Sequence, residues 1–201
     1  MASNRDSSRT AKVERQTKET RIELELALDG SGAYQVATGI PFFDHMLESF
    51  ARHALFDLNL DAEGDIKVDF HHTVEDVGIA LGQAFRQALG SAEGIRRFGF
   101  FVLPMAESKV EAAVDISNRP ALTYRVELEN SRIGDFDASL AEDFFHAFSQ
   151  NAGLDLHIEK RYGRSPHHVV EAAFKGVARA LREAAAIDPR EKGTPSVKGS
   201  L

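Results

Sequence analysis

Two short segments of the chain combine histidine and carboxylate side chains in the same pattern. Residues 69–76 read DFHHTVED and residues 165–172 read SPHHVVEA, so each holds two adjacent histidines and a glutamate four positions after the first of them. In a helix, residues four positions apart lie on one face, so His71 and Glu75 can bind one metal ion together. Imidazole and carboxylate ligands without thiolate suit Mn, Fe, Co, Ni or Zn.

The second histidine of each segment cannot easily serve the same ion as its neighbour. His72 and His168 are rotated by about 100° around the helix axis from His71 and His167. An isolated histidine pair at the start of a helix is usually polar surface. Here the pattern stands twice, 96 positions apart, and takes up four of the eight histidines. The sequence therefore predicts two metal sites. Each site holds the first histidine and the glutamate of one segment and the second histidine of the other segment.

Other histidines can complete these ligand sets. His45 lies in TGIPFFDHML, and His157 lies in the strand-like segment LDLHIEK. Either could instead be an ordinary surface or boundary histidine. His53 could contact a ligand or merely lie near the end of its helix. His146 follows two phenylalanines on an amphipathic segment, and we interpret it as structural.

The composition narrows the class of protein. With 43% hydrophobic and 27% charged residues, the chain of 201 residues can build a sizeable core. The absence of cysteine excludes disulfides and zinc–thiolate sites and fits a reducing cytoplasm. A net charge of −7 argues against nucleic acid as the main partner. No apolar run approaches the ~18–20 residues that span a bilayer, and the polar N-terminus does not resemble a secretory signal. We expect a cytoplasmic protein with no nucleic-acid or membrane partner.

Hydrophobic periodicity predicts the elements that position these residues. Strands are expected at residues 22–28, 33–38, 55–61, 66–70, 109–117, 121–129 and 154–160. Helices are expected around residues 43–54, 74–89, 140–148 and 170–185. The turn signal Asp-Gly-Ser-Gly at residues 29–32 predicts that the first two strands form a hairpin.

The second half of the chain repeats the first at the offset of 96. Asp69 and Ser165 correspond, and both are good N-cap residues for the helices that carry the histidines. Because each half is small, a shared core is expected. We predict an α+β fold, an internally duplicated unit with helices packed on one side of mixed β-sheets. The predicted organisation is a flexible arm at 1–12, a single domain at 13–201 with repeats at about 13–95 and 96–187, and a C-terminal tail at 188–201.

Six segments, read in order, resemble the imidazoleglycerol-phosphate dehydratase family of histidine biosynthesis. They are TGIPFFDHML, DFHHTVEDVGIALG, RRFG, DISNRP, GRSPHHVVEAAFKGVARALR and PSVKGSL. The resemblance runs from about Val13 to Leu201, although residues 125–140 carry no distinctive functional motif. It implies a duplicated fold similar to the second domain of ribosomal protein S5. The length leaves no room for the phosphatase domain fused to this enzyme in some bacteria, so the monofunctional form is expected.

The resemblance also implies a metal content and an assembly. It implies two Mn²⁺ ions per active site, with other divalent transition metals as alternatives, at subunit interfaces of a homo-oligomer. The expected assembly is a 24-subunit octahedral shell built from trimers. The ligands implied for the first ion are His45, His72, His167 and Glu171. Those implied for the second ion are His71, Glu75, His157 and His168.

The implied reaction, catalysed by a lyase, is dehydration of D-erythro-imidazoleglycerol phosphate to imidazole-acetol phosphate and water. With both ring nitrogens on metal ions, the imidazole can become imidazolate and expel the hydroxyl of the adjacent carbon. The neighbouring C–H is acidic in the resulting diazafulvene-like intermediate, and its loss gives an enol that relaxes to the ketone. Glu19 matches a family glutamate at the substrate site and is the favoured proton carrier. Glu75 or Glu171 could act instead while binding metal.

The small-molecule phosphate substrate requires cations. The residues that match the family's phosphate site are Arg97, Arg119, Lys175 and Lys198, with Ser196 as a hydroxyl donor. The rest of the expected substrate-binding set is Glu19, His45, His53, His71, His72 and His167. On sequence alone, these lysines and arginines are typical of solvated charged side chains on a protein surface. Two other functions remain open: a different binuclear metalloenzyme such as a hydrolase, and a non-catalytic metal-binding cage.

Overall fold

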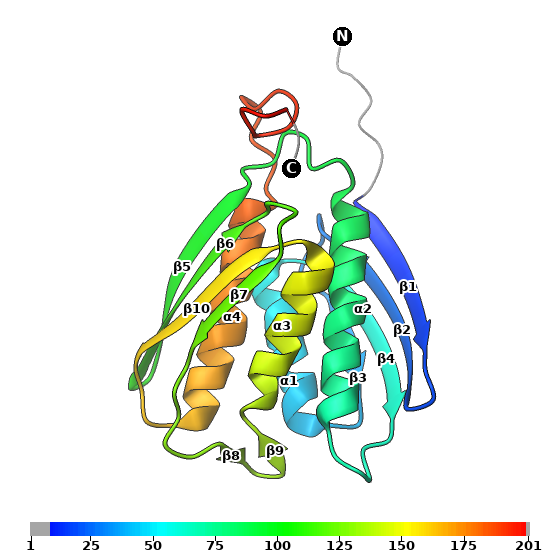
Figure 1. The fold of residues 1–201 in the computed structure, drawn as a ribbon, viewed down its shortest axis with the longest axis vertical. Coiled ribbons are helices and arrows are strands. Elements are labelled where there is room, and N and C mark those ends of the chain that lie inside the picture. Colours follow the sequence, from blue (N-terminus) through cyan, green and yellow to red (C-terminus); the bar gives the residue numbers. More distant parts are fainter. Residues whose placement is uncertain (1–8, 200–201) are drawn as a thin grey trace.

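In a computed structural model that describes residues 9–199, the fold consists of two four-stranded sheets with helices between them and a small two-stranded sheet, β8 with β9 (Figure 1). In chain order the elements are β1 (Thr10–Gln16), β2 (Thr20–Ala27), β3 (Tyr34–Ala37), α1 (Pro41–Ala54), β4 (Asp57–Gly64), α2 (His71–Leu89), β5 (Phe98–Met105), β6 (Ser108–Asp115), β7 (Ala121–Arg125), β8 (Arg132–Ile133), β9 (Phe136–Asp137), α3 (Leu140–Ala152), β10 (Asp155–Tyr162) and α4 (Pro166–Ala184). Among residues 9–199, no helix is long and apolar enough to cross a membrane.

The two sheets have the same topology. Their strand orders are β1-β2-β4-β3 and β5-β6-β10-β7, each beginning with a hairpin. In both sheets the last pair of strands is parallel, β3 with β4 and β7 with β10, while the other neighbours are antiparallel. In each half, a helix connects the parallel strands and a longer helix follows. The predicted duplicated α+β fold is confirmed.

The two halves share one core. The helices cover only the inner face of each sheet, as predicted (Figure 1). Along β2, Ile22 and Leu24 face this core, while the intervening Glu23 is exposed. Phenylalanine rings join the helices of both halves, with Phe50 and Phe148 centroids 6.0 Å apart across α1 and α3. The core therefore fixes the ends of all four helices relative to one another.

Close packing of α2 on α3 depends on two glycines. A Cβ at Gly78 would lie 2.8 Å from the carbonyl oxygen of Phe144, and one at Gly82 would lie 2.7 Å from that of Phe148. Real Cβ atoms do not approach backbone oxygens so closely, so larger residues here would push the helices apart. These glycines hold the N-terminal half of the chain against the C-terminal half.

Two strand predictions are wrong. β3 does not pair with β2 in a hairpin, because β4 occupies that edge of β2 and β3 pairs with β4 in parallel. A parallel pair needs a crossover, which α1 supplies. Residues 66–70, predicted as a strand, form the turn between β4 and α2, and Val68 in their centre is exposed.

Two other strands lacked a clear signal. Burial alternates along β5, but the polarity of its sequence does not, because the apolar residues Phe98 and Phe100 are exposed on the outer face while Leu103 is buried on the inner one. β1 begins at Thr10 and pairs along its length with β2, so residues 10–12 belong to the sheet rather than to the expected arm at 1–12. Most of that arm lies outside the described residues.

Candidate metal and phosphate sites

The two histidine segments begin α2 and α4, and these two helix starts lie at the same end of the molecule (Figure 1). At α4, Ser165 is the N-cap residue and its side chain accepts a hydrogen bond from the backbone N–H of His168. At α2, Asp69 accepts from the N–H of His71 at 2.9 Å, but Phe70 takes the N-cap position, one residue later than predicted. Side-chain oxygens of corresponding residues thus satisfy N–H groups at both helix starts.

Three predicted ligands of the first ion converge in one chain. His45 from α1 and His167 and Glu171 from α4 place one donor atom each within 4.8 Å of one another. The carboxylate of Glu171 lies 3.6 Å from Nε2 of His45 and 3.1 Å from Nε2 of His167. Two imidazoles converging on a buried carboxylate form a donor set that fits a divalent transition metal.

Glu171 also has a cationic neighbour. Lys175 Nζ lies 2.5 Å from its Oε1. Burial acts to raise the pKa of Glu171, but the hydrogen bond and charge of Lys175, together with His45 and His167, outweigh burial and bring the pKa below its ordinary value. Lys175 was predicted to bind phosphate, and the structure places it against this carboxylate instead. His53 lies close enough to Lys175 to feel its charge. Burial first, and then the charges of Lys175 and Arg179, lower the pKa of His53.

The predicted ligands of the second ion lie in separate places in one chain. His71 Nε2 lies 3.6 Å from Glu75 Oε2, so the helical pair forms as expected. His157, on β10, pairs instead with Asp155 at 3.1 Å. His168 directs Nδ1 at Glu107, 2.7 Å away. Within the described part of the chain, therefore, the first set gathers three of its four residues and the second set only two.

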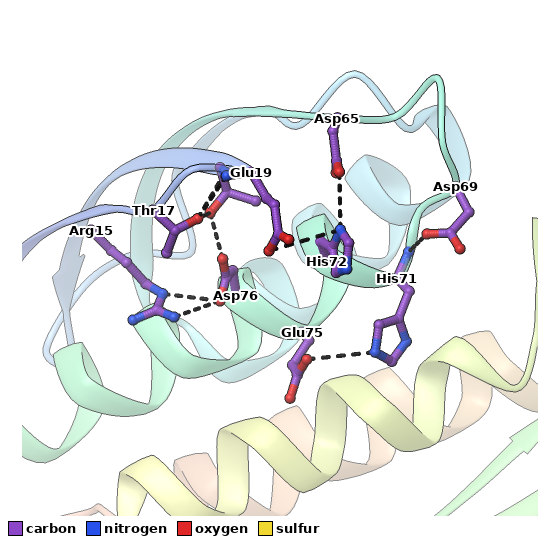
Figure 2. Close-up of polar contacts among 10 residues, drawn as sticks. Arg15, Thr17, Glu19, Asp65, Asp69, His71, His72, Glu75 and Asp76 are labelled. Carbon is purple, nitrogen blue, oxygen red and sulfur yellow. Dashed lines mark hydrogen bonds and ion pairs between the residues drawn. The ribbon is translucent and has the colours of Figure 1, made fainter.

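His72, the remaining predicted ligand of the first ion, faces a group of carboxylates at the start of α2 (Figure 2). Its Nδ1 lies 3.0 Å from Asp65 Oδ2, and this hydrogen bond raises the pKa of His72. Glu19 Oε2 lies 4.0 Å from the same nitrogen. The predicted proton carrier thus stands beside a predicted metal ligand.

A partly buried network of hydrogen bonds fixes the turn that carries Glu19 (Figure 2). Thr17 Oγ1 accepts hydrogen bonds from the backbone N–H groups of Glu19 and Thr20. Thr20 donates its hydroxyl to Asp76 in α2, and Arg15 donates to the same carboxylate at 2.7 and 3.0 Å. Asp76 is buried and lies four residues after His72, so the β1–β2 turn is tied to the face of α2 that carries His72.

Four of the five predicted phosphate residues gather at a second place. Arg97, Arg119, Ser196 and Lys198 line one cavity of about 950 Å³. Arg97 forms two hydrogen bonds with Asp115, at 2.6 and 3.0 Å, and a third with the carbonyl of Pro195. The C-terminal tail therefore folds against β5 and β6 and brings its serine and lysine to the two arginines.

The residues of this cavity and the predicted metal ligands lie at opposite ends of α4, a helix that can be followed in Figure 1. The backbone N–H of Arg97 donates to the carbonyl of Ala184, the last residue of α4, whereas His167 is the second residue of that helix. At 1.5 Å of rise per residue, these helix positions are about 25 Å apart.

No pattern in the sequence indicated three of the carboxylates that accompany the histidines. Asp65 and Glu107 lie in turns and Asp143 lies on α3, 3.4 Å from Nδ1 of His71. Hydrogen bonds from the backbone of Ser165 and then from His168 lower the pKa of Glu107 to about 2. Asp69 and Asp76 both belong to the quoted segment DFHHTVED.

Comparison with known proteins gives a consistent result. Residues 38–181 match the protein family described as imidazoleglycerol-phosphate dehydratase. Proteins of that name from Pelobacter propionicus and Azorhizobium caulinodans are 53% and 55% identical over 194 residues, covering 96% of this chain and 100% and 98% of theirs. Solved structures of the dehydratase from Staphylococcus aureus and Pyrococcus furiosus both align with a TM-score of 0.82. They are 34% and 35% identical and cover 89% and 94% of this chain, and 99% and 100% of their own chains.

Proposed function

This chain belongs to the imidazoleglycerol-phosphate dehydratase family, and from that premise we propose that it uses two divalent metal ions to dehydrate D-erythro-imidazoleglycerol phosphate. The family makes it a hydro-lyase of histidine biosynthesis, and the proposed product is imidazole-acetol phosphate. The convergence of His45, His167 and Glu171 is the observation that supports the metal-dependent route. Manganese is the proposed metal.

The proposed reaction breaks one C–O bond and moves a proton between carbons. When bound, the ions would hold both ring nitrogens and favour loss of the ring proton and of the hydroxyl on the adjacent carbon, through the diazafulvene-type route. The hydroxyl leaves with a proton as water. Glu19, beside His72, takes the proton from the next carbon. The enol becomes the ketone when the carbon next to the ring gains a proton and the enol oxygen loses one, and the ring nitrogen regains its proton as the product leaves.

The distance between the two sites supports a shared active site. Only a three-carbon chain separates the imidazole ring of the substrate from its phosphate. The residues for the two groups lie about 25 Å apart in one chain, so one substrate cannot contact both. We therefore assign the phosphate cavity and the metal trio of each active site to different copies. A closed symmetric homo-oligomer, such as the 24-subunit shell, provides such contacts.

Product analysis tests this function against the two others. Incubating the purified protein with Mn²⁺ and imidazoleglycerol phosphate is expected to yield a ketone and no inorganic phosphate. Release of inorganic phosphate would favour a binuclear hydrolase. Bound metal with neither product would favour a metal-binding cage.

Coexpression of two inactive variants tests the shared site. Arg119→Ala damages the phosphate cavity, and Glu171→Gln damages the metal trio. In mixed assemblies, sites that combine the intact cavity of one chain with the intact trio of the other are fully functional. With random mixing, about one quarter of the sites are of this kind. We expect kcat to recover to about a quarter of the wild-type value.

The control is each variant expressed alone, which is expected to stay nearly inactive. If coexpression restores no activity although mass spectrometry shows mixed assemblies, both groups act within one chain and the assignment is wrong.

A further inference from the structure

Each half of the chain begins with a hairpin whose turn carries a glutamate. Glu19 follows β1, and Glu107 lies between β5 and β6. Because the two sheets have the same strand order, the two turns occupy equivalent places in the fold. Each glutamate faces the second histidine of its own repeat. Glu19 Oε2 lies 4.0 Å from His72 Nδ1, whereas Glu107 Oε2 lies 2.7 Å from His168 Nδ1.

Glu107 is held by the helix that carries its histidine. Its Oε1 accepts hydrogen bonds from the backbone N–H groups of Ser165 at 2.8 Å and Arg164 at 3.3 Å. The hydroxyl of Ser108 lies 3.1 Å from the same oxygen. The other oxygen, Oε2, faces Nδ1 of His168. Rotation of the carboxylate would break contacts at the start of α4, so its orientation is fixed by groups other than the histidine.

This contact determines which nitrogen of His168 can bind a metal. An ionised carboxylate only accepts hydrogen bonds, so Nδ1 of His168 carries the hydrogen. In the neutral ring, Nε2 then holds the free lone pair. We propose that Glu107 is a positioning residue that fixes the tautomer and the ring orientation of His168 and presents its Nε2 to a metal ion. The proposal rests on the proposed function, which makes His168 a ligand.

In the first repeat, the turn glutamate and the residue that orients the histidine are two different residues. Asp65 contacts Nδ1 of His72 at 3.0 Å and so takes the orienting role. Its backbone N–H donates to the carbonyl of Glu19 at 3.1 Å, which ties the two turns together. Because Asp65 orients His72, the Glu19 carboxylate can remain 4.0 Å away. The repeats thus differ in function: one turn glutamate is available to carry a proton, and its counterpart holds a ligand.

The test is metal binding by Glu107→Gln, measured with Mn²⁺ alone. An amide can present its NH₂ to Nδ1, which favours the tautomer with hydrogen on Nε2. Loss of an orienting partner of a ligating histidine typically weakens metal affinity roughly 10- to 100-fold. Calorimetry of metal-stripped, refilled protein is therefore expected to show one class of Mn²⁺ site weakened by that factor and the other unchanged. Anomalous scattering at limiting Mn²⁺ is expected to show loss at the ion next to His168.

Two variants control for charge and shape. Glu111→Gln makes the same chemical change four residues further along the hairpin, where the carboxylate pairs with Arg161 at 2.6 Å, and is expected to leave both affinities unchanged. Glu107→Asp keeps an acceptor on a shorter side chain and is expected to restore part of the affinity.

Equal weakening of both ions, or unchanged affinity at both, in Glu107→Gln would overturn the positioning role. If wild-type protein turns over substrate while this variant binds both ions normally, only the positioning proposal fails. If wild-type protein neither binds Mn²⁺ nor turns over substrate, the proposed function fails, and the positioning role fails with it.

Discussion

Glu171→Gln is expected to lower kcat roughly a thousandfold and to empty one of the two metal sites. The substitution keeps the size of the side chain but removes the anionic member of the trio with His45 and His167. Lewis-acid stabilisation by a metal ion is worth several kcal/mol, and about 4 kcal/mol corresponds to this factor in rate. Lys175, 2.5 Å from Glu171, would also lose its anionic partner and repel a cation in the site.

Glu75→Gln provides the matched comparison, since Glu75 occupies the corresponding position of the first repeat and lies 3.6 Å from His71. It is expected to empty the other metal site and to lower kcat by a similar factor. If both ring nitrogens must be held at once, loss of either ion removes most of the rate acceleration that the two ions provide together. The kcat of the double variant is therefore expected to be only slightly lower than that of either single variant. Steady-state kinetics and metal analysis of the three proteins check this. Full activity with one ion missing would rule out the two-metal route.

Much of the fold followed from periodicity and the repeat. All four helices found between residues 9 and 199 were predicted, because apolar residues at helical spacing mark α1, α2, α3 and α4 clearly. The pairing of the strands was harder to predict from the sequence. The turn at residues 29–32 indicates a reversal of the chain, but it does not determine which edge the next strand joins. That choice depends on β4, which is distant in sequence from β2 and occupies the edge beside it.

The candidate site shows the same limit. The repeat indicated His71, Glu75, His167 and Glu171, because spacing on a helix determines which side chains share a face. It could not indicate Asp65 or Glu107, which reach their histidines through turns folded back from other strands. Helix spacing does place Lys175 beside Glu171, which lies four residues before it on α4, but it could not show that Arg97 lies at the far end of that helix. Contacts between distant segments require the tertiary fold.

Glu19→Gln is expected to leave both metal ions and the substrate bound while lowering kcat by about 10² to 10⁴, the usual contribution of general acid–base catalysis. Glu19 contributes no donor to the metal trio, and Thr17, Thr20 and Asp76 hold its turn through hydrogen bonds that glutamine at position 19 does not alter. KM is therefore expected to change little, in contrast to the metal-ligand variants. Glu23→Gln, on the exposed face of β2, is the matched control and is expected to keep wild-type kcat. Crystals of Glu19→Gln soaked with substrate should show intact imidazoleglycerol phosphate with both ions present. A near-normal kcat in this variant would remove Glu19 as the proton carrier and transfer the role to Glu75, Glu171 or water.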